Sequence, residues 1–153
     1  MSIGHFKAFT DLNPGQWFAA LGDKGVKIGL VVQFSKELRP PNELRPVFVS
    51  ESEAISTSPD GLQWVYTPDI TDISVDTKSL SKDVIHESGD IVITSDGAFL
   101  NFKRNSHSLF ANIATGRVAD SHTQALWFGK WSLLEKKPEG YKSLLDFGAV
   151  LKS

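Results

Sequence analysis

The sequence contains no cysteine. Disulfide bonds, thiolate metal sites and cysteine nucleophiles are therefore excluded, and the composition is compatible with a reducing compartment. Residues 1–11 show no basic segment followed by an apolar run, and no stretch approaches the roughly eighteen consecutive apolar residues of a membrane-spanning helix. From the sequence we therefore expect no membrane partner and, by default, a cytoplasmic location.

An excess of positive charge is also lacking. The chain has 16 Lys and Arg against 18 Asp and Glu, and its basic residues are scattered. A nucleic-acid partner is therefore not expected. With 153 residues, of which 41% are hydrophobic and 22% charged, the chain resembles an ordinary globular protein that buries a core without disulfides or a structural metal. We expect one β-rich domain spanning residues 1–153.

Patterns that indicate catalysis or metal binding are weak. The four histidines, none spaced as metal ligands, are His5, His86, His107 and His122. A small metal-assisted or acid/base hydrolase would have to use His86 with Glu87 or Asp90, or His107 near Arg104. Ordinary surface composition explains these polar residues more simply. We expect no metal and no cofactor and assign no catalytic residue, while a site containing His107 and His122 stays open.

What the sequence does contain is alternation of apolar and polar residues. Val26, Ile28, Leu30, Val32 and Phe34 lie at the two-residue period of a strand, which predicts a hairpin that turns at residues 22–25. Pro14 and Gly15 suit the centre of a type II turn before it. Residues 69–77 predict a half-exposed strand with Ile73 and Val75 on one face.

The spacing of strand and turn signals indicates the fold class. We expect a mainly β protein of roughly seven to ten short strands, arranged as a small antiparallel β barrel or sandwich. A barrel with partly opened edges is the preferred arrangement. At most one or two short helical turns are expected, around residues 79–83 and 141–146.

Residues 96–118 predict a second hairpin with a two-residue turn at Asn105 and Ser106. This register places Phe102 opposite Leu109, Leu100 opposite Ala111 and Ala98 opposite Ile113, so that one face is wholly apolar. The reverse face carries six side chains: Phe99, Asn101, Lys103, Ser108, Phe110 and Asn112.

Two large aromatic side chains on that reverse face have two explanations. A second packed layer, made by another strand or by the C-terminal segment, is the simpler one, because large aromatics supply much of the core in small domains. The alternative is a binding surface formed by Phe99, Asn101, Phe110 and Asn112, since exposed apolar patches are usually used. Deep burial of the two phenylalanines would exclude that surface.

The aromatic segment 124–133 favours a strand over a helix, because Gly129 and the aromatic residues disfavour a helix more than a strand. One continuous strand would place Trp127, Gly129 and Trp131 on the same side. A capping-box pattern at Ser121 and Gln124 keeps the helix as the alternative. Trp127 and Trp131 are secondary candidates for ligand contact, although tryptophans more often fill a core.

These observations favour a non-enzymatic module that binds a protein or a small-molecule ligand on a β scaffold. Two alternatives remain at this level. One is the small hydrolase described above, and the other is a structural subunit that forms a homo-oligomer through exposed edge strands.

Overall fold

We describe the fold from a computed structural model, for residues 5–22, 25–34, 44–59, 62, 64–69, 71–81, 88–105, 107–119 and 125–148. Over these residues the chain forms fifteen β-strands and two single 3₁₀ turns, η1 (Phe9–Asp11) and η2 (Thr77–Ser79). The described residues contain no α-helix, and none of their helical segments is long and apolar enough to cross a membrane. The expectation of a mainly β protein is confirmed, with more strands than the sequence indicated.

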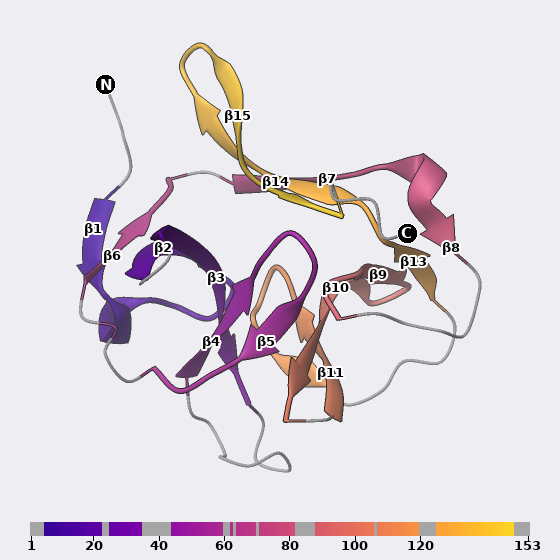
Figure 1. Ribbon diagram of the computed structural model, residues 1–153, viewed down its shortest axis with the longest axis horizontal. Helices are drawn as coiled ribbons and strands as arrows, with labels where there is room; N and C mark the ends of the chain where they lie inside the picture. Colours follow the sequence, from indigo (N-terminus) through magenta and orange to yellow (C-terminus); the bar gives the residue numbers. More distant parts are fainter. Residues whose placement is uncertain are drawn as a thin grey trace.

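Twelve strands form one strongly curved sheet, sheet A (Figure 1). They are β1 (His5–Ala8), β2 (Trp17–Gly22), β3 (Gly25–Gln33), β4 (Leu44–Val49), β5 (Ala54–Ser56), β6 (Trp64–Thr67), β8 (Leu80–Ser81), β9 (Ile91–Thr94), β10 (Gly97–Arg104), β11 (His107–Asn112), β12 (Val118–Ala119) and β13 (Leu126–Phe128). The order is β1-β6-β2-β3-β4-β5-β10-β9-β13-β8, and β11 joins β10 to β12. Within the described ranges this order has two ends, so the strands do not close into a barrel.

The remaining three strands form sheet B in the order β15-β14-β7, all antiparallel. They are β7 (Thr71–Val75), β14 (Trp131–Lys137) and β15 (Gly140–Phe147). The expected helical turn at 141–146 is wrong, because these residues pair with β14 from Lys137↔Gly140 to Trp131↔Phe147. A register shift at Leu133/Leu134 leaves Leu144 as the extra residue of β15, and Leu144 packs against the core. The other expected helical turn, at 79–83, overlaps η2 at Ser79 alone, because residues 80 and 81 form β8 and residues 82 and 83 lie outside the described ranges.

The main core lies where sheet B covers the inner face of sheet A (Figure 1). Trp131 is its largest contributor from sheet B: the indole is 2% exposed, stacks on Phe147 at 5.6 Å between ring centroids, and contacts Trp17 at 6.1 Å. Its Nε1 donates a hydrogen bond to the Gly89 carbonyl at 2.7 Å. This one side chain therefore ties both sheets to the segment that precedes β9.

Both predicted hairpins are confirmed. Gly22 pairs with Gly25 at the end of β2 and β3, and Arg104 pairs with His107 at the end of β10 and β11. The β10–β11 register matches the predicted one, with Phe102 opposite Leu109 and Leu100 opposite Ala111. The turn before β2 is also confirmed, since Gln16 N donates to Asn13 O at 3.1 Å and Gly15 has a φ of +89°.

Within the described part of the aromatic segment, residues 126–128 and 131–133 are strand, as preferred, but they belong to two separate strands. β13 belongs to sheet A and β14 to sheet B, and the chain changes sheets at Gly129 and Lys130. The expected common side of Trp127 and Trp131 is therefore wrong, because the two indoles enter different clusters. Ser121 and Gln124, which carried the helix alternative, lie outside the described residues.

Candidate binding groove

The reverse face of the β10–β11 hairpin is covered. Phe99, Phe110 and Trp127 are 6–7% exposed and pack with Val92, and the rings of Phe110 and Trp127 meet edge to face at 5.7 Å. β13 contributes to this burial, because its pairing with β9 beside β10 places Trp127, Val92 and Phe99 next to one another on one face of sheet A. The structure therefore favours burial of the two phenylalanines, and we correct the alternative: Phe99, Phe110 and Trp127 do not form an exposed contact surface.

The other three candidate residues also have structural roles. Asn101 is fully buried, and its backbone bonds to Gly89 and Asp90. Asn112 is half-buried and its Oδ1 accepts hydrogen bonds from the nitrogens of Ala114 and Thr115, which organises the turn after β11. Trp131 belongs to the main core. Phe99 and Asn112 do border a shallow hollow of about 650 Å³, beside Gln33 and Arg117.

The residues considered for a hydrolase are only partly described. His107 pairs with Arg104 across the hairpin end, and Asp90 is 9% exposed beside β9. His86, Glu87 and His122 lie outside the described residues. Among the described residues, no three His, Cys, Asp or Glu side chains gather in a way that could hold a metal ion.

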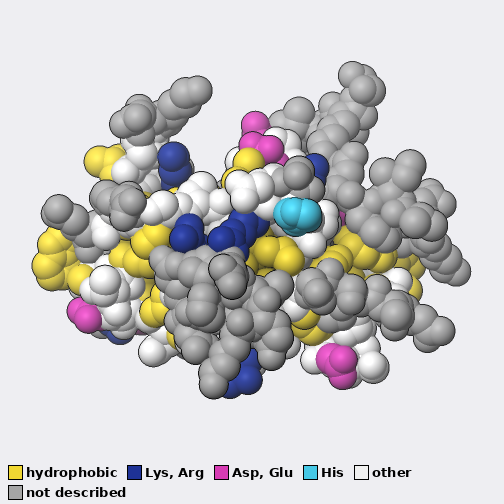
Figure 2. All heavy atoms as spheres, turned by 90° about the horizontal axis from the view of Figure 1, so that it is seen from below, with side chains coloured by type: hydrophobic (Ala, Val, Ile, Leu, Met, Phe, Trp, Pro, Cys, Tyr) yellow, Lys and Arg dark blue, Asp and Glu magenta, His cyan; other side chains and the backbone are white. Residues whose placement is uncertain are grey.

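An exposed apolar patch lies at one end of sheet A, where β1, β6, β2 and β3 run side by side. Phe6 is opposite Tyr66, Ala19 is opposite Tyr66, and Leu21 is opposite Val26. This antiparallel register brings Trp64 across from Leu21 on the same face. The patch consists of Phe6, Leu21, Val26 and Trp64, which are 72%, 86%, 70% and 69% exposed. Figure 2 shows hydrophobic side chains gathered at this end of the molecule.

The patch continues into a groove beside sheet B. The groove has a volume of about 990 Å³ and shares Val26 with the patch. Its walls come from the start of β3, the β4–β5 hairpin and the second half of β15; its lining residues are Val26, Lys27, Ile28, Phe48, Val49, Ser50, Glu51, Glu53, Ile55, Thr57, Ser143, Leu144, Leu145 and Asp146. Its size falls in the range of protein ligand sites, which are mostly apolar with a few polar groups.

The charged groups that line the groove are mostly acidic. Among the described lining residues, Glu51, Glu53 and Asp146 contribute three carboxylates against one ammonium, that of Lys27, which lies 5.5 Å from the centre of the Phe48 ring. Asp146 Oδ1 accepts hydrogen bonds from Ser132 Oγ at 2.6 Å and from Ser143 Oγ at 2.9 Å. These hydrogen bonds lower the pKa of Asp146, because they stabilise its charged form. The groove therefore presents a net negative charge over an apolar lining.

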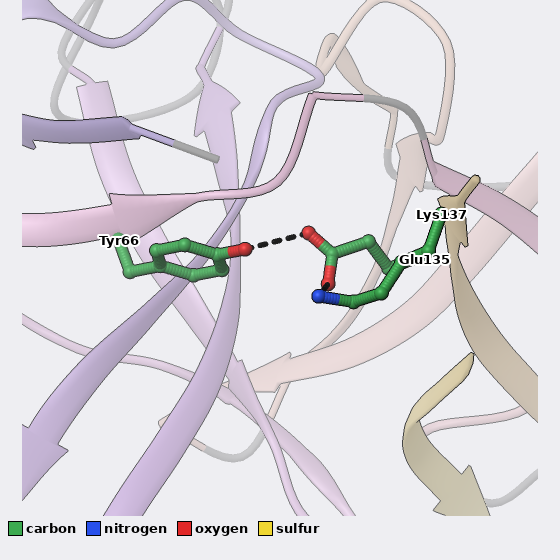
Figure 3. Close-up of polar contacts among 3 residues, drawn as sticks. All are labelled: Tyr66, Glu135 and Lys137. Carbon is green, nitrogen blue, oxygen red and sulfur yellow. Dashed lines mark hydrogen bonds and ion pairs between the residues drawn. The ribbon is translucent and has the colours of Figure 1, made fainter. Parts of the chain in front are cut away.

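A partly buried polar contact lies next to the patch and joins the two sheets (Figure 3). Tyr66 of β6 donates its phenolic hydrogen to Glu135 Oε2 at 2.7 Å, and Lys137 Nζ lies 3.4 Å from Glu135 Oε1. Glu135 is 4% exposed because it continues the inward-facing series of Trp131 and Leu133 on β14. Burial, followed by the hydrogen bond and the negative charge of Glu135, raises the pKa of Tyr66 to about 12.

Sequence patterning could have found part of this site. Extending the alternation of Trp131 and Leu133 by two residues puts Glu135 on the inner face, although the polar run that follows it is typical of a solvated turn. The exposure of Val26 has no such signal. Val26 continues the core series of Ile28 and Leu30, and only the extent of sheet B decides that it lies outside the covered area.

Replacing Tyr66 by phenylalanine is expected to lower the free energy of unfolding by about 1–3 kcal/mol, because buried Glu135 loses a hydrogen-bond donor. The pH dependence should change as well. The folded-state pKa lies above the unfolded value of 10.0, so the Tyr66 contribution is fully present below pH 10 and is lost as pH rises toward 12.

Urea denaturation at neutral pH and between pH 10 and 12 measures both effects, and Tyr141→Phe, at a 58% exposed tyrosine, is the matched control. Equal stability of Tyr66→Phe and Tyr141→Phe at neutral pH would contradict the structural role of this contact.

Comparison of the whole chain with known protein families, with curated proteins and with solved structures gives no match.

Proposed function

We propose that this protein is a non-enzymatic binding module whose ligand or protein partner occupies the groove and the apolar patch. One observation supports this most directly: four large apolar side chains, each at least 69% exposed, lie on one face and lead into a groove of about 990 Å³. Contiguous exposed apolar surface is costly in water and commonly marks interaction sites. A ligand seated there removes this surface from water.

The rest of the fold supports such a role. Sheet B covers the middle of sheet A and stops short of Leu21 and Val26, so the groove forms at the boundary between covered and uncovered core face. The contact between Tyr66 and Glu135 fixes the two sheets relative to each other at this boundary. A preformed groove of this kind reduces the entropy lost on binding.

The experiment selects ligands on the full-length chain from a fragment library and from a random peptide library displayed on phage. Affinities are then measured for the wild type and for Leu21→Asp and Val26→Asp. Both positions are exposed, so the fold should be kept. Replacing either apolar side chain should weaken the affinity for the selected ligands about tenfold to hundredfold.

Leu126→Asp is the matched control, because Leu126 is 44% exposed but lies on β13, at the other end of the strand order. Trp64 gives an independent signal, since the other three tryptophans are at most 6% exposed. Ligand should shield Trp64 from acrylamide quenching. Ligands that bind Leu21→Asp and Val26→Asp as tightly as the wild type would refute the proposed site.

A further inference from the structure

The groove follows the outer edge of sheet B. Among the described residues, β15 pairs with β14 alone. Four consecutive β15 residues, 143–146, line the groove. Because β15 is an end strand of sheet B, these four residues, which include the bulged Leu144, place the groove along the edge of that sheet.

The opposite side of the groove is the β4–β5 hairpin. Gly148 N, just beyond β15, donates to Glu51 O at 2.8 Å, so the strand and the hairpin tip meet at one end of the groove. β4 ends its pairing with β3 at Ile28↔Val49, and Val26 and Lys27 extend past it into the groove wall. The four lining residues of β15 span roughly 13 Å, which matches a short segment of extended peptide.

Charge selects among the peptides that could lie there. Among the described lining residues, Glu51, Glu53 and Asp146 against Lys27 leave a net charge of −2, three negative groups minus one positive. Both hydrogen bonds from the serines end on Asp146 Oδ1, so Oδ2 remains for an ammonium or guanidinium group. A basic segment complements these carboxylates.

We propose that an extended, basic peptide segment with alternating apolar residues binds in this groove by adding as a strand to the edge of β15. Its backbone pairs with β15, its apolar side chains contact the groove near Val26 and Ile55, and its basic side chains face Asp146 and the hairpin tip. This inference rests on the proposed function and specifies the partner for the same site.

The test uses three acetylated and amidated peptides of about eight residues, or ~26 Å when extended. The first alternates lysine and valine, the second alternates glutamate and valine, and the third is the lysine peptide with every internal amide N-methylated. Fluorescence polarisation with the full-length chain should show the lysine peptide binding at least about tenfold more tightly than either of the others.

Variants locate the contact. Asp146→Asn and Glu51→Gln should each weaken the lysine peptide several-fold, with an effect that decreases as salt rises. Glu139→Gln should leave binding unchanged, because Glu139 is exposed in the β14–β15 turn outside the groove lining. Hydrogen exchange should slow at the amides of residues 143–146 when the peptide is bound.

Each contrary result has a defined meaning. Equal binding of the lysine and glutamate peptides overturns the basic partner, and equal binding of the N-methylated peptide overturns strand addition. If the expected differences between the three peptides are not seen, while selected ligands still bind Leu21→Asp more weakly than the wild type, the proposed function stands without this partner. A dimer of the chain alone that protects the β15 amides, seen by light scattering and hydrogen exchange, overturns the inference in favour of a second copy.

Discussion

Replacing Trp131 by alanine is expected to lower the free energy of unfolding by about 3–5 kcal/mol. The 2% exposed indole fills the space between the sheets, stacks on Phe147 and contacts Trp17. Truncation leaves a cavity and removes the donor that satisfies the Gly89 carbonyl at 2.7 Å. For a small domain whose total stability is about 5–15 kcal/mol, such a loss is a large fraction.

Trp64→Ala is the matched control, because the Trp64 indole is 69% exposed and should change stability by less than about 1 kcal/mol. Urea denaturation followed by far-ultraviolet circular dichroism measures both variants without relying on tryptophan emission. Similar losses for Trp131→Ala and Trp64→Ala would contradict the packing of sheet B on sheet A described above.

Replacing Gly116 by alanine is expected to lower the free energy of unfolding by about 2–4 kcal/mol, because backbone strain and a steric clash both contribute. Gly116 has a φ of +73°, which disfavours a residue with a side chain. A Cβ there would also lie 2.3 Å from the nitrogen of Gly15 and 2.7 Å from the Pro14 Cβ. These neighbours belong to a turn that is held by the hydrogen bond from Gly15 N to Val31 O, so moving them away would break that bond.

Gly129→Ala serves as the control for this variant. A Cβ at Gly129 would meet Asp90 Oδ1 at 3.8 Å, an ordinary contact, and Gly129 does not have a positive φ. Its stability should stay within about 1 kcal/mol of the wild type. Thermal unfolding measures the stability of both variants. A Gly116→Ala protein as stable as Gly129→Ala would mean that the turn at Gly116 does not pack closely against the Pro14–Gly15 turn.

The candidate binding residues show how far sequence patterning reaches. The predicted register of the β10–β11 hairpin is correct, so Phe99 and Phe110 do share a face. Patterning could not show that this face is buried, because Trp127 joins Phe99 and Val92 on it through the pairing of β13 with β9 rather than through any local contact. The groove shows the reverse case: Val26 has the pattern of a core residue and is exposed, since sheet B ends before it.

The sequence by itself determined the local elements of this protein: the hairpins at 22–25 and 105–106, the Pro14–Gly15 turn, the half-exposed strand β7 and the mainly β class. Each depends on the two-residue period or on the backbone preferences of proline, glycine and asparagine, which act between near neighbours. The tertiary structure alone decided which faces are covered, where the chain leaves sheet A at Gly129, and where the groove opens. Those features depend on pairing between strands far apart in the chain, and an apolar side chain has the same period whether a second sheet or a partner covers it.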